Sequence, residues 1–259
     1  MIETLTQWTN DYFVLGLLVL TRITVLLLSI ASLTTGIPRR IQAILAVLIA
    51  CLLVPTVAAD QVGDLPSLQP WPELVIALGR EAMIGLLIGT TIQLIITGIQ
   101  VGAEVTSSSG ALQSASSTDD ATGQQMPTLA KLVGLLVVAV LFASGGHRMI
   151  LNVLLDSFQR MPPGDVVPHS SMMNLIVDQL TSGMSAGVRI AAPVLAALLL
   201  CNLVTGLISR TLPQLNVLAV GLSINALALL VVTAITIGSA GLIFQDELVS
   251  AADKLGQLW

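Results

Sequence analysis

The stretch "GLISRTLPQLNVLAVG", Gly206–Gly221, lies between two long runs that contain no charged residue. The run before it is Ile190–Ser209, and the run after it is Thr211–Gln245. An α-helix crosses the hydrocarbon core of a bilayer with about 20 apolar residues, so each run is long enough for a membrane-spanning helix. The junction is then either a polar turn between two spans or a polar surface that a partner contacts.

The composition of the whole chain agrees with a membrane protein. Hydrophobic residues make up 54% of the 259 residues and charged residues only 10%, whereas soluble domains carry about 25% charge. This small number of charges cannot give the chain a solvated surface. Lipid or partner subunits must therefore cover its outside. The net charge of −5 includes no basic cluster, which argues against nucleic-acid binding. Cys51 and Cys201 lie inside apolar runs and are expected to be small buried hydrophobic residues.

The apolar runs predict an all-α membrane protein with six or seven helices, forming a single domain over residues 1–259. The runs lack the period-2 alternation of a β-barrel. The opening residues, "MIETLTQWTND", lack the basic segment and cleavage site of a signal peptide, so the first run is expected to be retained. The fourth and fifth runs are short for independent spans, and the last two are long enough to be tilted, broken or extended beyond the bilayer. The predicted helices are Tyr12–Ile37, Ile41–Ala59, Leu74–Ala103, Leu129–Ala143, Met149–Met161, Leu175–Ser209 and Leu215–Phe244.

The connections and the glycine spacing add to this prediction. By the positive-inside rule, the turn at Arg39 and Arg40 is expected on the cytoplasmic side and the acidic loop Asp60–Glu73 outside. The segment Thr106–Pro127 is rich in Ser, Thr, Gly and Gln and is predicted to be a long irregular loop, a feature that is either functional or disordered. Glycines four residues apart predict helices that pack closely: Gly85 and Gly89, Gly98 and Gly102, Gly183 and Gly187.

Several charges lie inside or at the ends of the apolar runs, where each costs about 2.5–3.5 kcal/mol at the centre of a span. One interpretation is an ion or proton pathway, but Glu81 is the one good intramembrane carboxylate and Glu104 is marginal. A second is pairing within the chain, as Asp156 and Arg160 at i,i+4 would allow. A third is that the helices contact partner subunits rather than lipid. The charges are Arg22, Arg80, Glu81, Lys131, Arg148 and Arg189.

The sequence contains no catalytic constellation. His147 and His169 are the only histidines, and there is no nucleophile elbow, P-loop, dinucleotide-binding motif or metal-ligand spacing. We therefore expect no enzyme activity, no cofactor and no metal.

Three segments in order resemble one family. The first is "TGIPRRIQAILAVLIACLLVP", Thr35–Pro55, and the second is "GHRMILNVLLDSFQRMPPGD", Gly146–Asp165. The third has the pattern R-x-x-P-Q-x-N-x-x-x-x-G and follows "APVLAALLLCNLVTG". From Tyr12 to Phe244 the chain resembles the FliR family of flagellar export-gate proteins, which has virulence-type SctT relatives. The residues that match the third pattern are Arg210, Pro213, Gln214, Asn216 and Gly221.

The resemblance implies a structural and pore-forming subunit of the flagellar type III protein export gate. Such a subunit is a multi-pass protein of the bacterial inner membrane in the flagellar basal body. It assembles with FliP-like and FliQ-like subunits, an FlhB-like subunit docks alongside, and exported unfolded proteins pass through the channel. Two alternatives stay open: a subunit of a virulence-type secretion system, and a small secondary transporter working alone.

The residues of the third pattern also predict a site. Pro213 lacks a backbone N–H, so nearby carbonyls need other donors, which polar side chains around it can offer to them or to a neighbouring subunit. Arg210, Pro213, Gln214, Asn216 and Gly221 are therefore expected at a subunit interface rather than in a bare turn. The resemblance implies a second site. The loop in the middle of the chain is expected to enter the channel as part of its plug, with an ordinary linker as the alternative. It departs from the family pattern because Ala121 follows Asp120 where a proline is common, and no aromatic residue precedes it, so the plug is expected to be more polar. The expected plug residues are Gly110, Ser114, Ser116, Asp119, Asp120, Gln124 and Met126.

Overall fold

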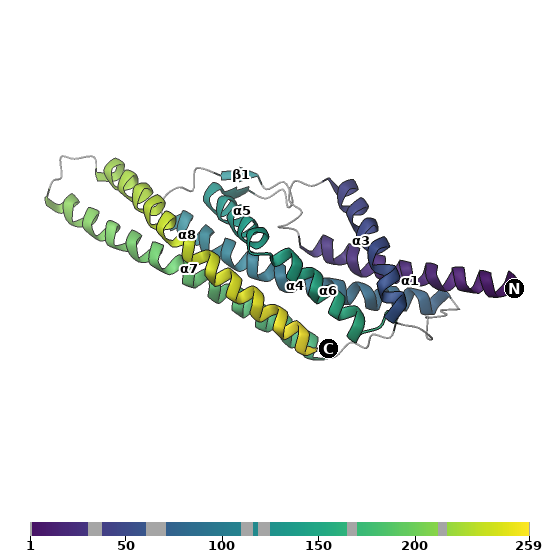
Figure 1. Cartoon of the computed structure of the whole chain (residues 1–259). Coiled ribbons are helices and arrows are strands. Elements are labelled where there is room, and N and C mark those ends of the chain that lie inside the picture. Colours follow the sequence, from purple (N-terminus) through teal and green to yellow (C-terminus); the bar gives the residue numbers. More distant parts are fainter. Residues whose placement is uncertain are drawn as a thin grey trace. The chain divides into compact units, whose positions relative to one another are not determined.

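The computed structural model describes residues 2–30, 38–60, 71–109, 116–118, 125–164, 170–211 and 217–258. Within these ranges the chain forms seven helices and one small sheet (Figure 1), which confirms the all-α prediction. The helices are α1 (Ile2–Ser29), α3 (Arg39–Asp60), α4 (Trp71–Ser109), α5 (Thr128–Ala143), α6 (Gly146–Arg160), α7 (Ser170–Thr211) and α8 (Val217–Leu258). The two strands are β1 (Ser116–Thr118) and β2 (Gln125–Pro127), which pair antiparallel.

Several helix ends differ from the prediction because polar residues continue the helices. Helix α1 begins at Ile2 rather than Tyr12, and α8 continues to Leu258 rather than ending at Phe244. Helix α4 reaches Ser109, so the segment Thr106–Pro127 is not wholly irregular as predicted. The hydroxyls of α4's last residues donate to carbonyls one turn back, which keeps these small polar side chains compatible with a helix.

Four helices are long and apolar enough to cross a membrane by length and composition, within the part of the chain that is described. They are α1, α3, α4 and α7. The number rises to six if the α5–α6 pair and the two parts of α8 each count as one bent span. The chain is therefore a multi-pass α-helical membrane protein by the length and composition of its helices.

The chain divides into two compact units. The first unit consists of residues 1–93, 147–178 and 250–259, and within it α1 and α4 pack in parallel. Val14 and Leu18 of α1 form a cluster with Ala77 of α4. Farther along the same two helices, a Cβ added at Gly85 would lie less than 3.0 Å from the backbone carbonyl oxygen of Arg22. The two backbones therefore touch, and only glycine fits between them.

Helix α3 belongs to the same unit and has little cover within the chain. Only 28% of its apolar span Arg39–Ala58 is buried. Cys51 is exposed, against the prediction that it is buried, because the packing between α1 and α3 is open around it. It lines an open apolar pocket of about 360 Å³ between α1 and α3, together with Gly16, Ala50 and Val54.

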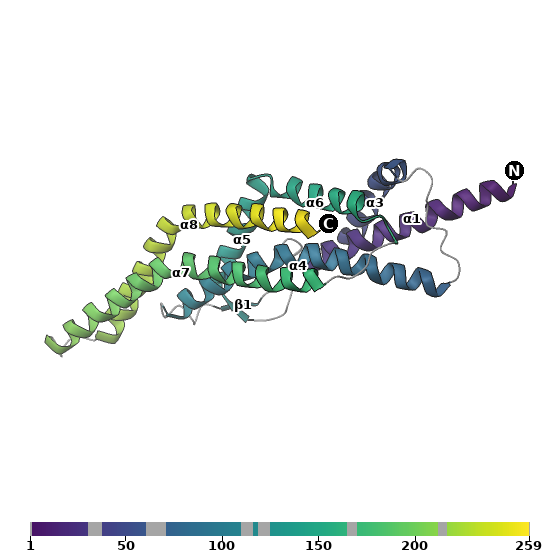
Figure 2. The same cartoon turned by 90° about the horizontal axis from the view of Figure 1, so that it is seen from below.

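The second unit consists of residues 94–146 and 179–249. In it α4 packs in parallel against α7, because Gly98 meets Gly183 and Gly102 meets Gly187. A Cβ added at Gly98 or Gly102 would lie less than 3.0 Å from the backbone of its partner glycine. The close packing predicted from the four-residue spacing is thus confirmed at these two pairs. Helices α7 and α8 run side by side toward the connection between them in both views (Figures 1 and 2).

Candidate functional site

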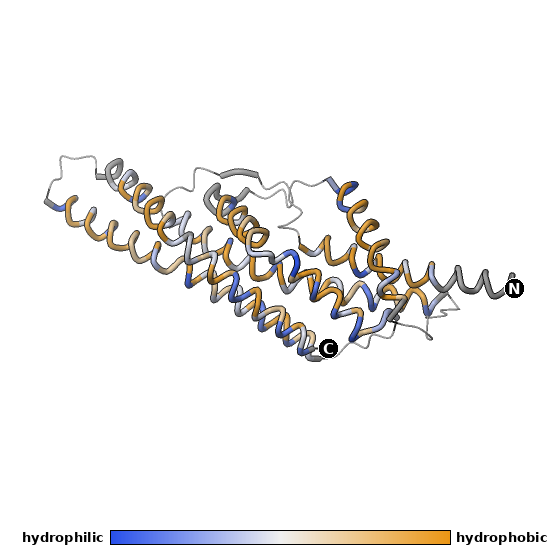
Figure 3. The backbone as a smooth tube through the Cα atoms, viewed as in Figure 1, coloured by the Kyte–Doolittle hydropathy of each residue, from blue (hydrophilic) through white to orange (hydrophobic). Residues whose placement is uncertain are grey.

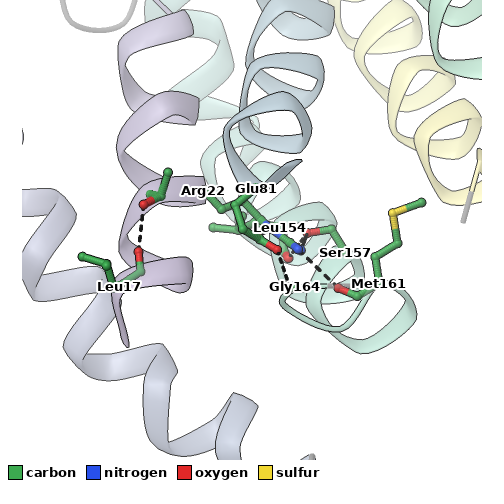
Figure 4. A network of polar contacts seen from close by, with 8 residues as sticks. Leu17, Arg22, Glu81, Leu154, Ser157, Met161 and Gly164 are labelled. Carbon is green, nitrogen blue, oxygen red and sulfur yellow. Dashed lines mark hydrogen bonds and ion pairs between the residues drawn. The ribbon is translucent and has the colours of Figure 1, made fainter. Parts of the chain in front are cut away.

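The most polar buried cluster of the first unit surrounds Arg22 of α1 (Figure 4). The side chains of Arg22 and Glu81 are both fully buried, and Arg22 Nε donates to Glu81 Oε2 at 2.6 Å. The two terminal nitrogens of Arg22 donate to Ser157 Oγ at 3.0 Å and to the Met161 carbonyl at 3.2 Å. We call these residues, together with Gly164, the Arg22 network. It joins α1, α4 and α6 and the turn that follows α6.

The network satisfies both charges inside the protein. The second carboxylate oxygen of Glu81 accepts from the backbone N–H of Gly164 at 3.0 Å, and Gly164 has a positive φ of 97°, which favours glycine. The guanidinium also lies 4.2 Å from the ring centre of Phe158, a favourable cation–π contact. Because Glu81 is paired and has no exposed surface, it does not face a water-filled path in this structure. Pairing within the chain is therefore the interpretation that holds for Arg22 and Glu81.

The sequence also suggested that Arg160 pairs with Asp156 one turn earlier, but Arg160 bonds to a backbone carbonyl instead. Arg160 donates to the carbonyl of Gly256 near the end of α8, within the same unit, at 3.0 Å. Arg189 of α7 lies 4.0 Å from Glu247 of α8, and its side chain is 64% exposed. An exposed pair of this kind is held only weakly.

The second feature is the pair of arms formed by α7 and α8 in the second unit. Val194 and Leu198 of α7 pack with Leu229 of α8, Asn202 meets Asn225, and Thr205 lies beside Gly221. As residue numbers increase along α7, the numbers of their contacts on α8 decrease, so the two arms are antiparallel. We call the arms Ile190–Thr211 and Val217–Thr236 the α7–α8 hairpin.

Most large side chains of the hairpin point away from its own interface. Leu199 is 70% exposed and Ile235 is 75% exposed. Figure 3 shows hydrophobic residues along both arms, whereas the later part of α8 alternates with hydrophilic residues. The hairpin therefore keeps a large apolar surface that nothing else in its unit covers. Other exposed members are Leu200, Leu203, Val204, Leu207, Leu227, Leu230 and Val231.

Two of the five predicted interface residues, Arg210 and Gly221, lie within the described part of the chain. Arg210 is exposed near the end of α7. Gly221 is buried, and an added Cβ would lie 3.0 Å from Thr205 Cγ2, so this glycine serves the contact between the two arms. Pro213, Gln214 and Asn216 lie outside the described residues, and the interface assignment stays a prediction.

The predicted plug residues are also described in part. Ser116 lies in β1 and Met126 in β2, and these two strands pair in the register Ser117 with Met126. The plug assignment stays a prediction. Gly110, Ser114, Asp119, Asp120 and Gln124 lie outside the described residues.

Sequence reasoning missed two groups of residues that make polar or cation–π contacts. Ser157 and Phe158 were noted only as part of a resembling segment, yet both contact the Arg22 guanidinium. Asn202 and Asn225 were not singled out, although an amide inside a charge-free apolar run is an unusual residue there. No group of three or more metal-ligating side chains occurs within the described ranges.

These features define a multi-pass α-helical membrane protein with a closed polar network inside one unit and an uncovered apolar hairpin in the other. Comparison with known proteins gives the family. The chain matches the family described as "Bacterial export proteins, family 1" over residues 13–251 and belongs to it.

Individual relatives agree with this assignment. The chain is 28% identical over 212 residues to "Flagellar biosynthetic protein FliR" of Caulobacter vibrioides, covering 82% of this chain and 83% of the relative. It is 26% identical over 217 residues to the protein of the same name from Escherichia coli, covering 83% and 79%. It is also 33% identical over 149 residues to "Surface presentation of antigens protein SpaR" of Shigella flexneri, covering 57% of each. The resemblance to the FliR and SctT proteins is confirmed, and the chain is a type III export membrane protein.

Proposed function

We propose that this chain is a structural and pore-forming subunit of the flagellar type III protein export gate. It assembles with FliP-like and FliQ-like membrane subunits in the bacterial inner membrane, and an FlhB-like subunit docks alongside. Together they form a gated channel for unfolded export substrates. The chain itself performs no enzymatic step.

The observation that carries the proposal is the length of α7 and its lack of cover. Its 42 residues at about 1.5 Å per residue give a helix of about 63 Å. The hydrocarbon core of a bilayer is about 30 Å thick. Only 17% of the apolar window Ser171–Arg210 is buried within the chain. Lipid tails alone leave part of this apolar helix uncovered, and this remainder supports a role for partner subunits that pack against it.

A stand-alone secondary transporter receives no such support. A transporter that uses a proton gradient needs a titratable side chain that water reaches from either side of the membrane. Glu81 is the best intramembrane carboxylate of the chain, and it is fully buried against Arg22. The export-gate proposal instead accounts for both the satisfied charges and the uncovered apolar surface.

Affinity purification tests the proposal. The chain is produced with a tag, either alone or together with the FliP-like and FliQ-like proteins of the same genome, and solubilised in mild detergent. We expect one large complex in the second case and aggregation or degradation in the first. A monodisperse, stable protein that purifies alone and binds neither subunit when they are present would contradict the proposal. The genes adjacent on the chromosome distinguish a flagellar system from a virulence-type one.

The segment between α4 and α5 is proposed to be the plug of this channel. Its small polar residues bury little apolar surface, so moving them aside costs little. The β1–β2 pair supports this only as a short, weakly held element, because an isolated two-stranded sheet is marginally stable. The junction from Arg210 to Asn216 is proposed as a contact with a neighbouring subunit, because Pro213 lacks an N–H and nearby carbonyls then need other donors.

A further inference from the structure

Two asparagines face each other in the middle of the apolar hairpin. Asn202 lies in the charge-free run Ile190–Ser209, and Asn225 lies in the charge-free run that follows. Asn225 Nδ2 donates to Asn202 Oδ1 at 2.6 Å. We call this pair the Asn202–Asn225 dyad.

The dyad leaves hydrogen-bonding groups without partners. A side-chain amide offers two N–H donors and one carbonyl acceptor, and the bond between the two amides uses one of each. Asn225 is 8% exposed, and its Oδ1 is buried without a hydrogen-bond partner. Asn202 is exposed, and its Oδ1 is already held by Asn225. Asn225 therefore acts as a positioning residue that fixes the Asn202 amide and leaves the Asn202 Nδ2 group on the uncovered side.

The surroundings of the exposed amide are apolar. Leu199, one turn before Asn202, is 70% exposed, and Leu203, which follows Asn202 directly, is 62% exposed. Lipid tails offer no acceptor for an amide, and leaving such a group unsatisfied in an apolar environment is costly. A protein helix that carries a hydrogen-bonding side chain satisfies both the apolar surface and the amide, as in helix association within membranes.

A notch lies one turn beyond Asn202 on the same face. Gly206 is four residues further along α7, it is exposed, and a Cβ added there would meet nothing within 4 Å. Glycine at such a position lets the backbone of another helix approach closely. Leu199, Asn202 and Gly206 follow the i, i+3, i+7 spacing of one helix face. An exposed apolar side chain (Leu199), a hydrogen-bond donor (Asn202) and a site of close helix approach (Gly206) therefore lie along one face of α7.

We infer that this face of α7 docks an apolar helix of a partner export-gate subunit, which places an Asn, Gln, Ser or Thr side chain opposite Asn202 and its own backbone near Gly206. The inference rests on the proposed function, because it names the part of the chain that one of those subunits contacts. The partner's polar side chain accepts from Asn202 Nδ2, and its apolar residues cover Leu199 and Leu203.

The test uses the full complex and a double substitution. Asn202→Leu/Asn225→Leu replaces both amides by apolar groups of similar size, which leaves no unsatisfied group inside the hairpin and so keeps its own fold nearly unchanged. One lost interhelical hydrogen bond is expected to weaken the binding of the partner by about three- to thirty-fold, read as the fraction of partner subunit retained through detergent washing. Asn174→Leu, an exposed asparagine of α7 outside the hairpin, is the matched control and should retain wild-type binding.

A second variant tests the notch without touching the dyad. A Cβ added at the exposed Gly206 meets nothing within 4 Å, so Gly206→Leu is expected to leave the hairpin folded and still reduce partner retention. A photo-crosslinking residue at Leu203 identifies the occupant directly. Crosslinks to a FliP-like or FliQ-like subunit support the inference, whereas crosslinks only to a second copy of this chain, or only to lipid, overturn it.

The outcomes separate this inference from the proposal on which it rests. If the wild-type chain binds no FliP-like or FliQ-like subunit, the proposed function fails and the inference fails with it. If the wild-type complex forms and both the double variant and Gly206→Leu retain their partners as the Asn174→Leu control does, the export-gate proposal stands and the docking inference is wrong.

Discussion

Removing the charge of Glu81 tests the Arg22 network most directly. Glu81→Gln keeps the size of the side chain and leaves the Arg22 guanidinium buried without a counter-charge. Breaking a buried ion pair on one side costs about 3–5 kcal/mol. For chains of roughly this size, 1 kcal/mol lowers the midpoint of thermal unfolding by about 2–4 °C. We therefore expect a midpoint lower by roughly 6–20 °C.

The reverse substitution and the double substitution sharpen this expectation. Arg22→Met should cost at least as much as Glu81→Gln, because Ser157 and the Met161 carbonyl also lose a donor. Arg22→Met combined with Glu81→Leu removes both charges and leaves only two backbone groups, at Met161 and Gly164, without partners. Each such group costs about 1–3 kcal/mol, so the double variant should lose clearly less than the sum of the two single losses.

The assay uses the chain co-produced with the FliP-like and FliQ-like subunits and solubilised in detergent. It measures the fraction of this chain that still elutes in the folded complex after heating, by size-exclusion chromatography across a temperature series. Arg40→Gln is the matched control, because Arg40 is an exposed arginine of the same unit and surface substitutions usually stay within about 0.5 kcal/mol. If Glu81→Gln lowers the midpoint no more than this control does, the network is not a stabilising pair and the reasoning is refuted.

Three further expectations follow from other parts of the chain. Gly98→Ala should lower the thermal midpoint, because its Cβ would lie less than 3.0 Å from the Gly183 backbone. The control Gly79→Ala, in the same helix, meets open space and should be neutral or slightly stabilising. Equal midpoints for the two variants would contradict the α4–α7 contact. Arg210→Glu should abolish recovery of the complex and Arg210→Lys should weaken it, and normal assembly and secretion by Arg210→Glu would mean that the junction is a bare turn. Replacing residues 110–124 by a short Gly-Ser linker should leave assembly intact but admit a small dye into cells, and an assembled complex without added leak would identify the segment as a linker.

The sequence predicted the helices well and their ends poorly. The number of helices follows from the apolar runs because the bilayer fixes how many apolar residues a helix needs. The end of α4 was misplaced because Thr106 and Ser109 count as loop residues by composition, yet their hydroxyls bond to carbonyls one turn back. The beginning of α1 and the end of α8 were missed because those segments are polar, and an apolar-run criterion cannot detect a polar helix.

The polar contacts were predictable in kind but not in partner. Arg22 and Glu81 stood out because charges in apolar runs are costly. That they pair with each other depends on α1 and α4 packing in parallel, and one sequence does not fix that register. The glycines gave more information, since Gly98 and Gly183 each signalled close packing and they meet each other. Gly85 signalled the same but packs against the backbone of Arg22 instead of another glycine.

Arg22 and Asn202 are both polar residues of apolar helices, and the difference between them separates folding from assembly. The Arg22 guanidinium is surrounded by acceptors and an aromatic ring from its own unit, so the chain meets the cost of burying it without outside help. Asn202 has one hydrogen bond, to a buried asparagine, and its apolar neighbours remain uncovered. A polar group that is satisfied within the chain stabilises the subunit whether or not partners are present. A polar group held in place but left unsatisfied gains its remaining hydrogen bonds only on binding, so substitutions at Asn202 should weaken the complex while those at Arg22 should weaken the subunit itself.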